Sequence, residues 1–163
     1  MKNNFRVLLL IIIINILSCS SSQSFNNFYN HHKNDNNVSS FQVPSYLRSL
    51  IKNASPELND IFKNVKEFKS ISFTDCSLQQ SNQINDEINM ITKNYTDVRR
   101  KNTEEKRSLV SVKEKGDVIK EMIIHTSKNN NHFILFLKGN FDPERIQSLA
   151  NENELNDLYD INL

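Results

Sequence analysis

Two histidines at the ends of an expected hairpin are the residues whose spacing most directly suggests chemistry. His125 and His132 bracket the turn-forming run 127–131, which contains three consecutive asparagines. In an antiparallel hairpin, residues so placed lie on a cross-strand diagonal, close enough to share a metal ion or to pass a proton. Residues at a hairpin end are more commonly solvated, so we expect these two imidazoles to face water.

Cys76 is the other side chain with intrinsic reactivity. It follows an expected strand and precedes an expected helix, whose amino end could lower the pKa of a thiol. A thiol nucleophile also needs a base, and no histidine lies near Cys76 in the sequence. We therefore expect a free cysteine that is at least partly buried.

The remaining titratable residues show no spacing that selects a site. His31 and His32 are adjacent in a polar segment, which offers a metal ion no preformed geometry. The carboxylates that could pair as acid and base are Asp75, Asp86, Glu87 and Glu121. We predict no catalytic residue, no cofactor and no metal ligand. The alternative is an enzyme or metal-binding protein whose site is assembled in space around His125, His132 or Cys76.

One basic cluster comprises residues 99–101 and the pair Lys106-Arg107. Charges on an edge strand discourage edge-to-edge aggregation, which is sufficient reason for them. Docking of an acidic partner or headgroup is the functional alternative, and Glu104 and Glu105 in the same segment weaken it by offsetting part of the charge.

The composition of the whole chain excludes several classes of protein. The 163 residues leave room for one domain with appendages. With 20 basic and 19 acidic residues, the chain lacks the strongly basic character of a nucleic-acid binder. Two glycines exclude a glycine-rich phosphate loop, and two cysteines exclude a disulfide framework or a four-cysteine zinc site.

The first residues resemble an export signal. Lys2 and Arg6 precede an apolar run over 7–14, which is too short for a comfortable membrane span. The run leads into Leu-Ser-Cys at 17–19, which resembles the lipobox of bacterial lipoproteins. The resemblance implies cleavage before Cys19 and attachment of acyl chains such as palmitate, because a cysteine thiolate is readily alkylated. An ordinary signal peptide, cut at another small residue, is the alternative.

The expected domains follow from changes in composition. Residues 1–18 are the lipoprotein signal peptide, and 19–37, rich in Ser and Asn without a periodic pattern, are a flexible tether. A folded domain covers 38–150, and 151–163 form a polar tail. Without residues 1–18 the chain has one more acidic than basic residue, so we expect its membrane attachment to be covalent rather than electrostatic.

The folded domain is predicted to be α+β. A short extended segment at 38–43 precedes helices over 46–51 and 58–65, a strand over 68–74 and a helix that begins after Ser77 with Ile84, Ile88, Ile91 and Tyr95 on one stripe. A β-meander follows, with strands at 96–101, 108–113, 118–126 and 132–138, and a last helix opens at Asp142-Pro143. This order predicts two layers: a mostly antiparallel sheet of four to five strands with helices packed on one face.

Three segments in the middle of the chain carry a family resemblance. They are the strand 68–74, the segment 112–124 with its Gly-Asp turn, and the segment 133–142 with Ile146 and Leu149 behind it. Together they resemble the DUF4252 family, an uncharacterised domain of small exported proteins from Bacteroidota, over residues 43–150. The resemblance implies an exported α+β domain and transfers no catalytic residue. The Asn-rich turn at 129–131 departs from the Gly-rich turns common in that family.

We therefore expect a lipid-anchored cell-envelope protein that is not an enzyme and that binds a protein or another envelope component rather than nucleic acid. No acidic stretch follows Cys19, which favours the periplasmic face of the outer or inner membrane. Three glycosylation-type triplets, which begin at Asn37, Asn53 and Asn94, leave a secreted eukaryotic glycoprotein as a further alternative. The sequence does not identify the partner, the leaflet or the oligomeric state.

Overall fold

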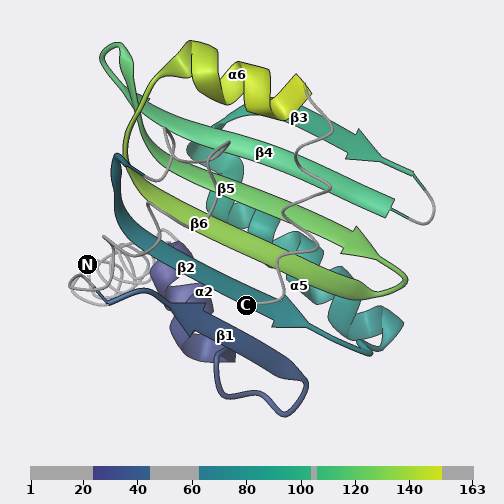
Figure 1. Cartoon of the computed structure of the whole chain (residues 1–163). Coiled ribbons are helices and arrows are strands. Elements are labelled where there is room, and N and C mark those ends of the chain that lie inside the picture. Colours follow the sequence, from purple (N-terminus) through teal and green to yellow (C-terminus); the bar gives the residue numbers. More distant parts are fainter. Residues whose placement is uncertain (1–23, 45–62, 104–105, 152–163) are drawn as a thin grey trace, which may run out of the picture.

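The computed structural model describes residues 24–44, 63–103 and 106–151, which contain an open antiparallel sheet of six strands. The strand order is β1-β2-β6-β5-β4-β3, so β6 and β5 are central (Figure 1). The strands are β1 (Val38–Gln42), β2 (Val65–Phe73), β3 (Thr96–Asn102), β4 (Lys106–Lys115), β5 (Val118–Lys128) and β6 (Asn131–Phe141). The predicted α+β class and antiparallel sheet are confirmed, with six strands rather than four to five.

Two tight turns join the three long strands β4, β5 and β6, as the sequence predicted. Gly116 in the first turn has φ 64°, and Asn129 and Asn130 in the second have φ 52° and 61°. Glycine and asparagine tolerate this left-handed backbone at little cost, which explains their place in the turns. The turns fix the register that places the candidate histidines.

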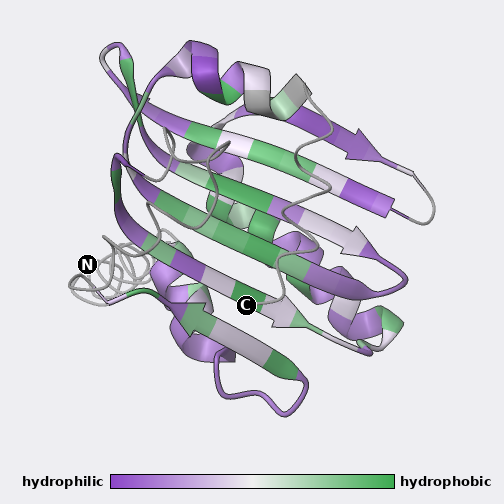
Figure 2. Ribbon diagram, in the orientation of Figure 1, coloured by the Kyte–Doolittle hydropathy of each residue, from purple (hydrophilic) through white to green (hydrophobic). Residues whose placement is uncertain are grey.

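Helices cover both faces of the sheet. Helices α2 (Phe25–His32) and α5 (Leu78–Ile91) lie behind it in Figure 1, and α6 (Pro143–Asn151) lies in front. A single 3-10 turn, η2 (Thr92–Asn94), follows α5. The expectation that all helices share one face is wrong for α6. Figure 2 shows hydrophobic residues along β4 to β6, and their side chains divide between two buried clusters on opposite faces, so each face needs a cover.

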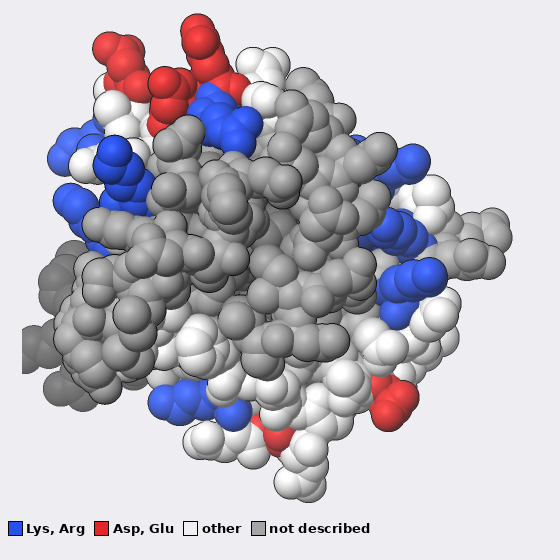
Figure 3. All heavy atoms as spheres, viewed as in Figure 1, with Lys and Arg blue, Asp and Glu red and all other residues white. Residues whose placement is uncertain are grey.

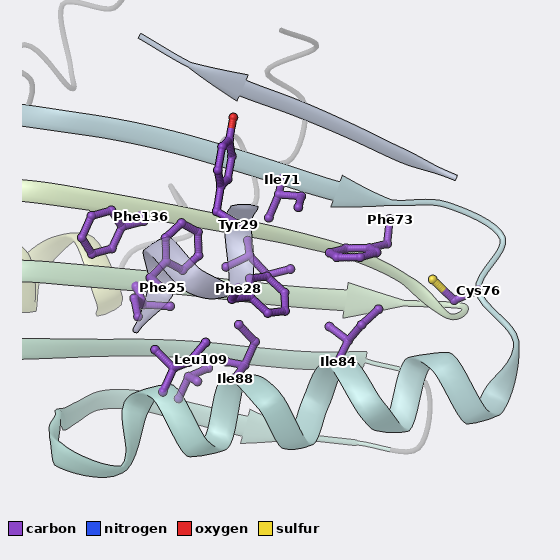
Figure 4. Close-up of a cluster of buried hydrophobic side chains, with 13 residues drawn as sticks. Phe25, Phe28, Tyr29, Ile71, Phe73, Cys76, Ile84, Ile88, Leu109 and Phe136 are labelled. Carbon is purple, nitrogen blue, oxygen red and sulfur yellow. The ribbon is translucent and has the colours of Figure 1, made fainter. Parts of the chain in front are cut away.

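The face under α2 and α5, which we call the α5 face, carries an aromatic core. Phe25 stacks on Phe136 with ring centroids 4.8 Å apart, and Phe28 lies 5.9 Å from Phe73 (Figure 4). The buried members of this core are Phe25, Phe28, Tyr29, Ile71, Phe73, Cys76, Ile84, Ile88, Ile91, Leu109, Ile123, Ile134 and Phe136. They come from α2, α5, the four strands β2, β4, β5 and β6, and the loop that holds Cys76, so α2 belongs to the fold as fully as α5.

The opposite face, under α6, has a second apolar cluster. Its buried members are Val43, Phe68, Val110, Val112, Ile119, Met122, Ile124, Leu135, Leu137, Phe141, Ile146 and Ala150. Alternate residues of β4, β5 and β6 therefore point into the two clusters, as the pleat of a strand requires. This alternation divides the side chains of β5 and β6 between the two faces.

The prediction of a flexible tether over 19–37 is wrong from Ser24 onwards, because residues 25–32 of it form α2. Ser24 caps α2 by accepting a hydrogen bond from the backbone N–H of Asn27, and the helix buries Phe25, Phe28, Tyr29 and His32. These positions have the i, i+3, i+4, i+7 spacing of a helix face, but the intervening asparagines mask it. Asparagine is a poor helix former, so packing on the sheet must stabilise this short helix.

Most of the other predicted elements are confirmed within the described residues. They are the strands of the meander, the strand at 68–74, the helix after Ser77 and the helix at Asp142-Pro143; residues 38–42 form β1. Ser77 accepts from the N–H of Gln80, and Asp142 accepts from that of Glu144, so both caps form. The predicted helix at 58–65 is wrong at its described end, because residues 63–64 form a turn and Val65 begins β2. The rest of that helix, the helix 46–51, the signal peptide, Cys19 and the tail beyond 151 lie outside the described residues. Among the described helices none is long and apolar enough to cross a membrane.

Candidate functional site

The structure brings His125 and His132 together with a third residue, Ser81. His125 Nε2 lies 3.0 Å from His132 Nδ1, and His132 Nε2 lies 2.8 Å from Ser81 Oγ. The two imidazole rings stack with centroids 5.3 Å apart. Ser81, His132 and His125 therefore form a continuous side-chain hydrogen-bond chain, which we call the Ser-His-His chain.

The sheet register produces the contact between the two histidines. His125 pairs with Ile134 on β6, and His132 is two residues from Ile134 on the same face. This is the predicted cross-strand diagonal, but the prediction that the imidazoles face water is wrong. His125 is 0% and His132 1% exposed, because α5 lies across this end of the sheet and places Ser81 over β6.

Burial keeps both imidazoles neutral. Loss of hydration lowers the pKa of His132 from 6.5 to about 4, with a further contribution from the nearby Arg107 cation. The pKa of His125 is also lowered well below 6.5, by burial first and then by His132, Arg107 and Arg100. At neutral pH each ring therefore has one N–H and one acceptor nitrogen.

The hydrogen bonds of the Ser-His-His chain can point in either of two directions, depending on the tautomers of the two histidines. The two directions give the Ser81 hydroxyl different roles. If both rings carry their proton on Nδ1, the Ser81 hydroxyl donates to His132 Nε2, as an activated serine does. If both carry it on Nε2, His132 donates to Ser81 instead and cannot act as its base. Ser81 is 7% exposed, so a substrate would have little access to it in this conformation.

Cys76 lies at the edge of the aromatic core and takes no part in the chain (Figure 4). Its Sγ is 3.8 Å from the side-chain nitrogen of Asn37. Burial, with the nearby Asp75 carboxylate, raises the pKa of the thiol. The expectation of a buried free cysteine is confirmed, whereas the lowered thiol pKa that the start of α5 could have caused is not found.

The adjacent histidines His31 and His32 do not form a metal site. His32 is buried, with Nδ1 2.9 Å from Asp35 and Nε2 3.1 Å from Glu87 on α5. The contact with Glu87 joins α2 to α5, which is a structural role. Within 24–44, 63–103 and 106–151, no group of three His, Cys, Asp or Glu side chains is placed to hold a metal ion.

Most of the basic cluster serves the fold. Arg99 donates to the backbone oxygen of Ala150 near the end of α6, and Arg100 pairs with Asp97 at 2.6 Å. Arg107 donates to Asn89 on α5. Figure 3 shows basic side chains at the ends of β3, β4 and β5 on the right, and mixed charges near the start of α6. β3 is an edge strand, as predicted.

Sequence reasoning missed Ser81. It lies on the buried stripe of α5 with Ile84 and Ile88, and this spacing was the available signal that it faces the sheet. Its contact with His132 joins residues 51 positions apart, so local pattern could not reveal it.

The chain matches a known family model. The family model described as a domain of unknown function (DUF4252) matches residues 29–149. No curated protein matches the chain. The matched range contains all six strands and all three members of the Ser-His-His chain, and it begins inside α2.

Proposed function

Because the chain belongs to the DUF4252 family, whose function is unknown, we propose from its own residues that it is a lipid-anchored cell-envelope protein with a non-enzymatic binding domain. The leader and the Leu-Ser-Cys segment at 17–19 support acylation of Cys19. The anchor would hold the domain on the periplasmic face of the outer or inner membrane.

The observation that carries this proposal is the short distance along the chain between Cys19 and the folded domain. The cap residue of α2, Ser24, is only five positions after Cys19. Five residues span at most about 18 Å, even when fully extended. An acylated Cys19 would therefore keep the start of α2 close to the headgroups, which favours a partner that is itself at or near the membrane.

The burial of the reactive side chains favours binding over catalysis. The two histidines of the Ser-His-His chain are neutral and covered, and the Cys76 thiol has a raised pKa. A sheet that packs against helices on both faces suits a protein that presents a fixed surface. We propose a protein partner in the envelope, since the face shown in Figure 3 carries both signs of charge.

Metabolic labelling with an alkynyl fatty acid tests the anchor. We expect the wild-type chain and the matched control Cys76→Ala to be labelled and to sediment with membranes, and Cys19→Ala to be unlabelled. A Cys19→Ala protein that still carries the label would contradict the proposal. Cross-linking in the native envelope, followed by capture of the full chain, would then identify the protein beside it.

A second candidate function is favoured by one observation, the 2.8 Å contact between Ser81 and His132. With His125 behind it, His132 could serve as the base for a serine nucleophile in acyl transfer. A fluorophosphonate probe tests this: labelling of the wild type and of Ser77→Ala, but not of Ser81→Ala, would support an enzyme. No labelling of folded wild-type protein would favour the binding domain.

A further inference from the structure

Three buried polar atoms on the α5 face have no hydrogen-bond partner among protein groups. They are Nδ1 of His125, Nε of Arg107 and Oδ1 of Asn85. Leaving such an atom unpaired costs about 1–3 kcal/mol, so native proteins rarely do so. Three of them on one face therefore call for an explanation.

The fold places these three atoms together. Ser81, Asn85 and Asn89 follow each other at i, i+4, i+8 on α5, so they lie along one side of the helix. Ser81 contacts His132 on β6, and Asn89 contacts Arg107 on β4. Since β5 lies between β6 and β4, the middle residue of the row, Asn85, lies above β5.

The strand register places His125 of β5 beneath the same part of α5. His125 pairs with Leu109 on β4, and Arg107 is two residues from Leu109 on the same face. Arg107 and His125 are thus diagonal neighbours beneath α5, and the Arg107 charge contributes to the lowered pKa of His125. The three residues that carry the unpaired atoms therefore lie on the α5 face, at the crossing of α5 over the β4–β5 pair.

We propose that Asn85, Arg107 and His125 bind one buried water molecule, which extends the Ser-His-His chain from Ser81 to Arg107. A water molecule can accept from Arg107 Nε–H and donate to Asn85 Oδ1. The water can also accept from His125 Nδ1 when that nitrogen carries the proton, or donate to it when it does not. Three hydrogen bonds are typical of an internal water molecule.

The local chemistry favours water over an anion. A halide or another anion without a proton cannot donate a hydrogen bond, so it would leave Asn85 Oδ1 unsatisfied in this orientation of the amide. The charge around Arg107 is also already balanced, because Arg107 and Arg100 interact with Asp86 and Asp97. The water site does not depend on either proposed function. It would bear on the second candidate function only if the Ser-His-His chain activates Ser81.

A pair of matched substitutions on α5 tests the site through the sign of a stability change. Asn85→Leu removes the acceptor beneath the helix, and Asn82→Leu makes the same change at an exposed position of the same helix. If water is bound, Asn85→Leu removes one of its hydrogen-bond acceptors, and the urea midpoint of the full-length Asn85→Leu protein falls below that of Asn82→Leu. If no water contacts these atoms, removing an unpaired acceptor raises the midpoint of Asn85→Leu above that of Asn82→Leu instead, which overturns the proposal.

A high-resolution crystal structure of the wild-type chain gives an independent answer that needs no variant. Density for one water molecule in contact with Asn85, Arg107 and His125 supports the site. A bromide anomalous peak there after a bromide soak would overturn it in favour of an anion. A direct bond between the Asn85 amide and His125 would overturn it as well.

Discussion

Replacing Phe28 by alanine tests whether α2 is part of the folded domain or only a linker. Phe28 is 1% exposed and packs against Phe25, His32 and Phe73. Loss of its hydrophobic transfer energy and the cavity left behind should lower the free energy of unfolding by about 3–4 kcal/mol. With a urea m-value of about 1.5 kcal/mol/M, the midpoint should fall by about 2 M.

The assay is urea unfolding of the full chain, followed by circular dichroism, with Phe41→Ala as the control. Phe41 is the same residue type on β1 but is 42% exposed, so its loss should cost about 1 kcal/mol. A Phe28→Ala midpoint equal to that of wild type would refute the packing of α2. It would also remove the argument that the anchor holds the domain close to the membrane.

Three further predictions concern the histidines, an arginine and the cysteine. The unfolded chain protonates His132 near its ordinary pKa of 6.5, whereas the folded protein does so only at about 4. The free energy of unfolding should therefore fall as the pH drops from 6.5 towards 4, by up to about 1.4 kcal/mol per pH unit from this residue. The measurement is the urea midpoint against pH, and its slope should be flatter in His132→Asn than in the wild type. Arg99→Met removes the bond to the carbonyl of Ala150, so amide exchange in α6 should accelerate while that in α5 is unchanged; equal acceleration in both helices would contradict a local role. Cys76, buried and with a raised pKa, should react with iodoacetamide at least about tenfold more slowly than a free cysteine until urea unfolds the protein, and fast reaction of the folded chain would contradict this.

The strands and most helices were predictable because their signals are local. Ser77 and Asp142 cap helices through backbone groups two or three residues away, and Gly116 turns the chain without help from distant residues. The apolar run of β6 likewise requires cover on both faces wherever it lies. Such features need only neighbours in the sequence, so their chemistry can be read from the sequence.

The sequence alone therefore determined the order of the described strands, the diagonal placement of His125 and His132, and the expectation that Cys76 is a buried free thiol. Only the tertiary structure decided that α5 covers these histidines and adds Ser81, because that contact depends on how a helix lies across strands far away in the chain. It also decided that Phe25 and Phe28 fold into the core: the Asn-rich helix has little propensity of its own, and burial of its aromatic face stabilises it only once the sheet is present.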